Sequence, residues 1–130
     1  MERLFLQIAT AFSALVLLGI GVSGVMLGVQ FLHGAGTITV DNYFRFLSGV
    51  IAAIGIVFLV SVPHVERYRE RFAILTFAIV VGGFAHLYSV SLHGIPSVGT
   101  LFGLFMELVY APLLWLLQRH VARRAALHPH

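Results

Sequence analysis

The sequence predicts an all-α membrane protein, a four-transmembrane-helix bundle formed by a single domain of 130 residues. Hydrophobic residues make up 59% of the chain and charged residues only 10%. The mean hydropathy of +0.98 is far above that of a soluble domain. Four apolar runs each reach the ~20 residues that a helix needs to cross the hydrocarbon core of a bilayer. We therefore expect four spans joined by short links.

The first apolar run covers residues 4–32, and the second covers residues 43–62. A cleavable signal peptide has an apolar core of only ~7–15 residues, so we interpret the first run as a retained span that tilts or leaves one end in the interface. Asp41 or Asn42 is suited to cap the second helix. Pro63 follows the last apolar residues of that helix and closes it.

The third run covers residues 72–92, and the fourth covers residues 98–117. The link at residues 65–71 alternates glutamate with arginine, as is typical of a solvated loop. Residues 94–97, with the sequence Gly-Ile-Pro-Ser, predict a tight turn between the last two spans. Pro112 lacks the backbone N–H that its place in the fourth helix requires, so we expect this helix to bend there.

The arginines predict the orientation of the chain in the membrane. All eight basic residues are arginines, and Arg45 alone belongs to the side opposite the other seven. Because cytoplasmic segments carry an excess of basic residues, both termini and the link at residues 63–71 are expected in the cytoplasm. The seven arginines on that side are Arg3, Arg67, Arg69, Arg71, Arg119, Arg123 and Arg124.

Charge and composition also exclude several functions. The net charge is +3, but no basic stripe interleaved with aromatic residues lies outside the spans, so we expect arginines at lipid headgroups and no nucleic-acid partner. Cysteine is absent, which excludes disulfides and thiolate chemistry. His86 and His93 lie ~10.5 Å apart along one helix, too far to chelate one ion unaided. We expect no metal and no cofactor.

Small residues recur at steps of three and four along all four runs. This spacing places them on one face of each helix, where they allow neighbouring backbones to approach closely. The glycines that we expect at helix contacts are Gly21, Gly24, Gly28, Gly82, Gly83, Gly99 and Gly103.

Three polar residues, Arg45, His86 and Glu107, lie inside apolar runs. An ionisable group at that depth costs ~2.5–3.5 kcal/mol on insertion scales and needs a partner, a proton or water. From a rise of ~1.5 Å per residue, His86 lies ~9 Å and Glu107 ~13 Å below the outer ends of their spans. We therefore expect the three side chains to converge in a pocket in the outer half of the bundle. Other candidate members of this pocket are Asp41, Asn42, Tyr88 and His93.

Each of these residues also has a purely structural interpretation. Arg45 could reach the outer interface or pair with Asp41 one turn away. His86 could be a hydrogen-bonded packing residue, and Glu107 could be protonated or neutralised by Arg45. One axial histidine would be enough to ligate a haem or chlorophyll, but nothing else in the sequence favours a pigment.

Several short motifs occur along the chain: residues 41–49 (DNYFRFLSG), Gly82-Gly83, Leu87-Tyr88-Ser89, Gly94-Ile95-Pro96-Ser97 and Glu107-Leu108 with Pro112-Leu113. Together they resemble a family of small four-span bacterial inner-membrane proteins that is catalogued as a domain of unknown function. The likeness covers nearly the whole chain. It implies a four-span fold and a multi-pass location in the bacterial inner membrane, and it implies no activity.

Three classes of function remain open. The one that we favour is an accessory or interaction subunit, which buries its apolar faces against a larger membrane-protein complex or other copies of itself. The second is a small transporter, a channel, or a module that binds a lipid or small molecule in the outer-half pocket. The third is a membrane-embedded lipid-modifying enzyme with Glu107 and His86 as acid and base. This last class needs more groups within reach than the sequence shows.

Overall fold

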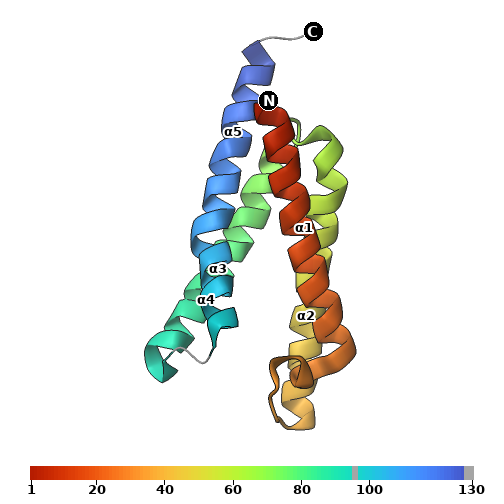
Figure 1. Cartoon of the computed structure of the whole chain (residues 1–130), viewed down its shortest axis with the longest axis vertical. Helices are drawn as coiled ribbons and strands as arrows, with labels where there is room; N and C mark the ends of the chain where they lie inside the picture. Colours follow the sequence, from red (N-terminus) through yellow and green to blue (C-terminus); the bar gives the residue numbers. More distant parts are fainter. Residues whose placement is uncertain (95–96, 128–130) are drawn as a thin grey trace. The chain divides into compact units, whose positions relative to one another are not determined.

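A computed structural model describes residues 1–94 and 97–127 of the chain (Figure 1). Across these residues all regular structure is helical, and no strand is present. Two residues of the predicted turn at 94–97, Ile95 and Pro96, lie outside the described residues. The elements in chain order are α1 (Glu2–Leu27), η1 (Gly28–Leu32), α2 (Ile38–Ser61), η2 (Val62–His64), α3 (Arg69–His93), α4 (Val98–Phe105), η3 (Met106–Tyr110) and α5 (Ala111–Leu127).

Four helical segments are long and apolar enough to cross a membrane: Glu2–Leu32, Ile38–His64, Arg69–His93 and Val98–Leu127. The prediction of an all-α protein with four candidate membrane-spanning helices is confirmed. Large apolar side chains are exposed along each segment, as with Phe77 of α3, which is 72% exposed. Such surfaces suit the hydrocarbon interior of a bilayer. The orientation of the termini stays a prediction.

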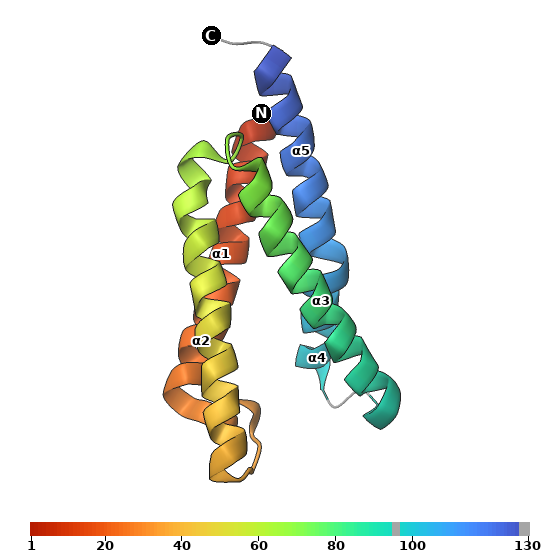
Figure 2. The ribbon, with the colours of Figure 1, turned by 180° about the vertical axis from the view of Figure 1, so that it is seen from behind.

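The helices form two compact units. One unit, Gln7–Pro63, contains most of α1 together with η1 and α2. The other contains Met1–Leu6, which includes the first turn of α1, and His64–His130, which includes α3, α4, η3 and α5. Within each unit the long helices lie side by side, α1 against α2 and α3 against α5 (Figures 1 and 2).

In the Gln7–Pro63 unit, α1 and α2 approach closely through glycines of α1. A Cβ atom at Gly21 would lie 2.5 Å from the backbone nitrogen of Ala52 and 2.7 Å from the carbonyl oxygen of Ser48. A Cβ atom at Gly24 would overlap the side chain of Ser48. Any larger residue at these positions would therefore collide with α2.

The connection between α1 and α2 uses backbone conformations that favour glycine. Gly28 has φ +61° and a buried position, and it ends the regular part of the first helical segment. Thr37 caps α2, because its side-chain oxygen accepts a hydrogen bond from the N–H of Val40 at 3.3 Å. The prediction that Asp41 or Asn42 caps this helix is wrong, because α2 begins one turn earlier, at Ile38.

In the second unit, the fourth membrane segment is not a continuous α-helix. Residues Met106–Tyr110 form a π-helical turn, and the N–H of Ala111 donates to the carbonyl oxygen of Met106. Pro112 follows immediately and cannot donate a backbone hydrogen bond, so this is where the regular α-helical pattern is easiest to interrupt. The irregularity expected at Pro112 thus takes the form of a widened turn that includes Glu107.

Candidate functional site

His86 of α3 and Glu107 of η3 form a hydrogen-bonded pair between two apolar helical segments. The Nδ1 atom of His86 lies 3.1 Å from Oε2 of Glu107. Glycines make room for this contact on both segments. A Cβ atom at Gly83 would lie 2.8 Å from the Cβ of Glu107, and one at Gly103 would lie 3.3 Å from Cε1 of His86. The contact between His86 and Glu107 therefore depends on glycine at both positions.

The His86–Glu107 pair can share a proton in two ways. Either the imidazole N–H donates to the carboxylate, or the O–H of a carboxylic acid donates to the imidazole nitrogen. The side chains are 35% and 30% exposed. No second hydrogen bond joins Nε2 of His86 or Oε1 of Glu107 to another residue in the described part of the chain. Each side chain therefore keeps one polar atom for a further partner.

Arg45 of α2 forms a second polar cluster, which joins the end of α1 to the start of α2. Its Nε lies 2.6 Å from Oδ2 of Asp41, one turn earlier on the same helix. Its Nη1 donates to the carbonyl oxygens of Val25 and Met26, at 2.5 and 3.2 Å. The other oxygen of Asp41, Oδ1, accepts the N–H of Val29 at 2.9 Å. We call these contacts the Arg45 clamp, and they satisfy backbone groups at the end of a helix.

Arg45→Gln is expected to lower the midpoint temperature of thermal unfolding in detergent micelles by more than Arg123→Gln does. The first variant removes the ion pair and leaves two carbonyl oxygens without their charged donor, whereas Arg123 is exposed near the end of α5. Adding Asp41→Asn to Arg45→Gln is expected to recover part of the loss, because the unpaired carboxylate is removed. Equal midpoints for the two single variants would contradict the clamp.

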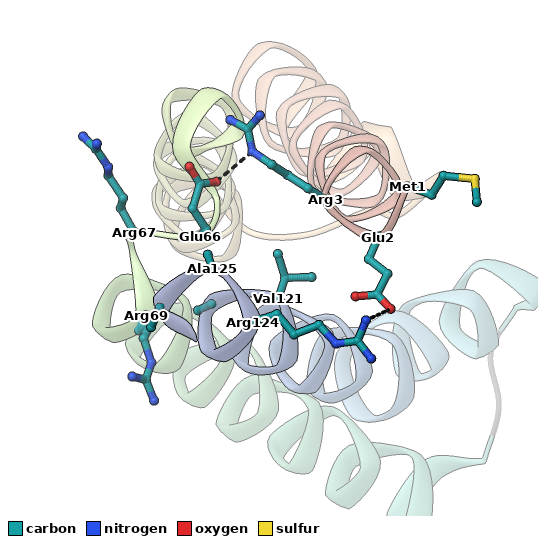
Figure 3. Close-up of a pocket in the computed structure, with 11 residues that line it drawn as sticks. Met1, Glu2, Arg3, Glu66, Arg67, Arg69, Val121, Arg124 and Ala125 are labelled. Carbon is teal, nitrogen blue, oxygen red and sulfur yellow. Dashed lines mark hydrogen bonds and ion pairs between the residues drawn. The ribbon is translucent and has the colours of Figure 1, made fainter. Parts of the chain in front are cut away.

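A cleft of ≈1130 Å³ opens where the first turn of α1, the link before α3 and the last turns of α5 meet (Figure 3). Two ion pairs cross it. Nε of Arg3 lies 3.1 Å from Oε2 of Glu66, and Nη1 of Arg124 lies 3.0 Å from Oε1 of Glu2. The charged residues that line this arginine cleft are Glu2, Arg3, Glu66, Arg67, Arg69 and Arg124.

The profile of a family described as Domain of unknown function (DUF4345) matches residues 5–118. The chain belongs to the DUF4345 family. No curated protein and no solved structure matches it. The residues of this DUF4345 protein that the profile covers include Arg45, His86 and Glu107, whereas Val121 and Arg124 of the arginine cleft lie beyond them.

The residues expected to share one pocket divide between the two units of the DUF4345 protein. Arg45 and Asp41 contact each other in one unit, and His86 contacts Glu107 in the other. A meeting of Arg45 with the His86–Glu107 pair would join the units, and it stays a prediction.

The remaining candidates are mostly at exposed positions. Asn42 and Tyr88 are exposed, and Nδ1 of His93 lies 3.1 Å from the carbonyl oxygen of Ser89 in its own helix. A Cβ atom at Gly82 would meet nothing within 4 Å, and one at Gly99 would meet Ser97 Oγ at 3.5 Å. Within residues 1–94 and 97–127, no three histidine or acidic side chains are grouped as they would be to hold a metal ion.

The arginine cleft is not evident from the sequence, because these arginines are already explained there as signals of membrane orientation. The cleft needs three segments that lie far apart in the sequence to come together. The signal that could have indicated it is the recurrence of glutamate beside arginine, at Glu2-Arg3 and again at Glu66-Arg67. A glutamate of one such dipeptide can pair with an arginine of another segment, so that some of the remaining arginines have no acidic partner.

Glu66 has a lowered pKa in this cleft. Partial burial raises the pKa of the carboxyl group, but the opposing effects are larger together. These are a hydrogen bond from its own backbone N–H, the hydrogen bond from Arg3, and the positive charges of Arg3 and His64. The pKa of Glu66 therefore lies below its ordinary value of 4.5.

A lowered folded-state pKa means that the ion pair contributes stability above pH 4.5 and that this contribution is lost as the pH falls through the folded-state pKa. Wild type is expected to be more stable than Glu66→Gln near pH 7, by up to ~1 kcal/mol since the pair is partly exposed. The difference is expected to disappear under more acidic conditions. Unfolding in detergent at several pH values measures it, and Arg3→Gln should reduce the same pH dependence without abolishing it, because the hydrogen bond from the backbone N–H of Glu66 remains. A difference that stays the same at every acidic pH at which both proteins remain folded would contradict this assignment.

Proposed function

We propose that this DUF4345 protein is a multi-pass membrane protein that binds a small polar molecule or lipid headgroup at the His86–Glu107 pair. The observation that carries the proposal is the 3.1 Å contact between these side chains within two runs, residues 72–92 and 98–117, that contain no other charged residue. Ionisable residues inside membrane-spanning segments are costly to place there and commonly mark ligand or proton sites.

The exposure of the pair supports binding over packing alone. A hydrogen-bonded pair that served only to join two helices would be most stable with both side chains fully enclosed. His86 and Glu107 instead remain 35% and 30% exposed, with Nε2 and Oε1 available. With a proton on Nε2, a ligand that accepts from Nε2 and donates to Oε1 would satisfy both atoms. An enzyme would need further reactive groups around the pair.

Gentle purification of the full chain followed by mass spectrometry tests this proposal. Wild type is expected to retain a stoichiometric small molecule or lipid. Glu107→Gln keeps the size of the side chain and its ability to hydrogen-bond, so it should fold with a similar unfolding midpoint and lose that molecule. Glu70→Gln, on an exposed residue in the first turn of α3, is the matched control. Retention of the same molecule by Glu107→Gln would reject the site.

An accessory or interaction subunit is the second candidate. It is supported by a continuous apolar face on α3, where exposed side chains recur at steps of three and four. These are Ile74, Phe77, Val81 and Phe84, which are 67, 72, 51 and 61% exposed. This spacing is typical of a helix that packs along another helix, and it also suits lipid. A stoichiometric protein partner in the same purification would favour this function.

We also propose that both termini face the cytoplasm and that the protein resides in the bacterial inner membrane. The seven-to-one division of arginines supports this orientation. Because the sequence lacks cysteine, single cysteines introduced at His130 and Ile38 can be labelled from either side without background. Labelling from the periplasm is expected at position 38 and not at position 130. The reverse pattern would overturn the orientation.

A further inference from the structure

We propose that the arginine cleft binds the phosphate group of an anionic phospholipid. The cleft is separate from the His86–Glu107 pair and does not depend on the function proposed for that pair. The arginines of the cleft would recognise any phosphate ester. The position of the cleft at the end of a candidate membrane span favours a phospholipid.

The charge of the cleft favours an anion. Four arginines and two glutamates line it, which leaves a net charge of +2. Both glutamates are already paired, Glu66 with Arg3 and Glu2 with Arg124. Among the described residues, no carboxylate lies within ion-pair distance of the Arg67 or Arg69 guanidinium. These two arginines are therefore uncompensated.

The shape of the cleft provides space for a headgroup. Figure 3 shows one ion pair on each side of the opening, with Val121 and Ala125 between them. The floor consists of small apolar residues, so a volume of ≈1130 Å³ stays open above it. Pockets of ~300–1,000 Å³ hold ordinary small ligands. Arg67 and Arg69 lie at the edge of the cleft, with their guanidinium groups directed away from Val121 (Figure 3). Rotation about the bonds of these long side chains would let them form paired N–H···O hydrogen bonds to the oxygens of a bound phosphate.

The surroundings of the cleft favour a phospholipid over free phosphate. Arg3 lies at the start of a candidate membrane span, and the next residues along α1, Leu4 and Phe5, are 60 and 63% exposed. A headgroup held by Arg3 would thus have apolar side chains beside it for its acyl chains. Arginines at the ends of membrane spans lie at the level of the headgroups, and each raises the affinity for anionic lipid by about fivefold.

The test is a binding titration of the full chain in detergent micelles with phosphatidylglycerol, phosphatidylcholine and inorganic phosphate. Wild type is expected to bind phosphatidylglycerol in preference to the other two. The double variant Arg67→Gln with Arg69→Gln should weaken that binding by about tenfold to thirtyfold. Each single variant should weaken the binding of phosphatidylglycerol by about threefold to fivefold. The single variants therefore provide the test if the double variant does not fold.

The matched control removes the same charge outside the cleft. Arg119 and Arg123 lie on α5 but do not line the opening. Arg119→Gln with Arg123→Gln should therefore reduce the affinity by less than about threefold, because salt screens charges that lie away from the site. An equal loss in the two double variants would overturn the proposal, because binding would then follow net charge alone. Binding of inorganic phosphate without binding of phosphatidylglycerol would overturn the lipid assignment.

Discussion

Gly24→Leu is expected to lower the free energy of unfolding by at least ~1–3 kcal/mol, the usual cost of forcing extra atoms into a well-packed contact. Even the first added carbon at Gly24 would overlap the side chain of Ser48 on α2. Ser48 is buried and its hydroxyl already donates to the carbonyl oxygen of Phe44 at 2.7 Å, so it cannot turn away without losing that bond. The two helices would have to separate along their contact.

Gly19→Leu is the matched control for this experiment. It makes the same change on the same helix, but a Cβ atom at Gly19 would meet nothing within 4 Å. Both variants remove one glycine from α1, so the gain in helix propensity is common to the two. Titration of unfolding in mixed micelles should show a large loss for Gly24→Leu and little or none for Gly19→Leu. If both variants unfold like wild type, the glycine face of α1 is not a packing surface.

Gln118→Ala is expected to cost ~2–4 kcal/mol, because it combines a cavity with a lost hydrogen bond. Gln118 of α5 is fully buried, and its Nε2 donates to the carbonyl oxygen of Val65 at 2.9 Å. Val65, also fully buried, lies in the link that carries Glu66 and Arg67 into the arginine cleft. The substitution would remove the side chain and leave that carbonyl without its donor.

Gln118→Met separates the two contributions. Methionine has nearly the same volume, so it leaves no cavity, and it removes Oε1 of Gln118, a buried atom without a hydrogen-bond partner among the described residues. The gain from removing that atom offsets much of the loss at Val65. We expect Gln118→Met to cost less than ~1.5 kcal/mol, and thermal or denaturant unfolding of both variants measures the difference. A methionine variant as unstable as the alanine variant would show that the hydrogen bond dominates.

The four helices could be predicted because an apolar run of about 20 residues has few other ways to satisfy its backbone in a membrane. The contacts between helices could not be predicted in the same way, because they depend on which helices are neighbours. Gly82 and Gly83 are adjacent in the sequence, and periodicity cannot choose between them. In the structure a Cβ atom at Gly83 would lie 2.7 Å from Leu108, while one at Gly82 would meet nothing.

The same limit applies to the polar residues. Depth along each helix placed His86 and Glu107 at similar levels, but depth does not say which helices are neighbours. Their contact depends on Gly83 and Gly103, and the partners of Arg45 depend on where α1 ends. The arginine cleft was hidden for a further reason. Charged residues at span ends have an adequate explanation in membrane orientation, so nothing in the sequence required them to meet.

The π-helical turn at Met106–Tyr110 also changes which sides of the fourth membrane segment are aligned. An α-helix advances by ~100° per residue, and a π turn accommodates one residue more than an α turn in nearly the same rise. Regular α-helical spacing from Gly99 and Gly103 therefore does not identify the residues of α5 that lie on the same face of the segment. Removing one residue from this turn would restore a continuous α-helix and rotate Gln118 and the arginines of α5 by about a quarter of a turn relative to α4. The length of this five-residue turn therefore determines how far Arg124, the arginine of α5 that lines the cleft, is rotated about the helix axis relative to Glu107.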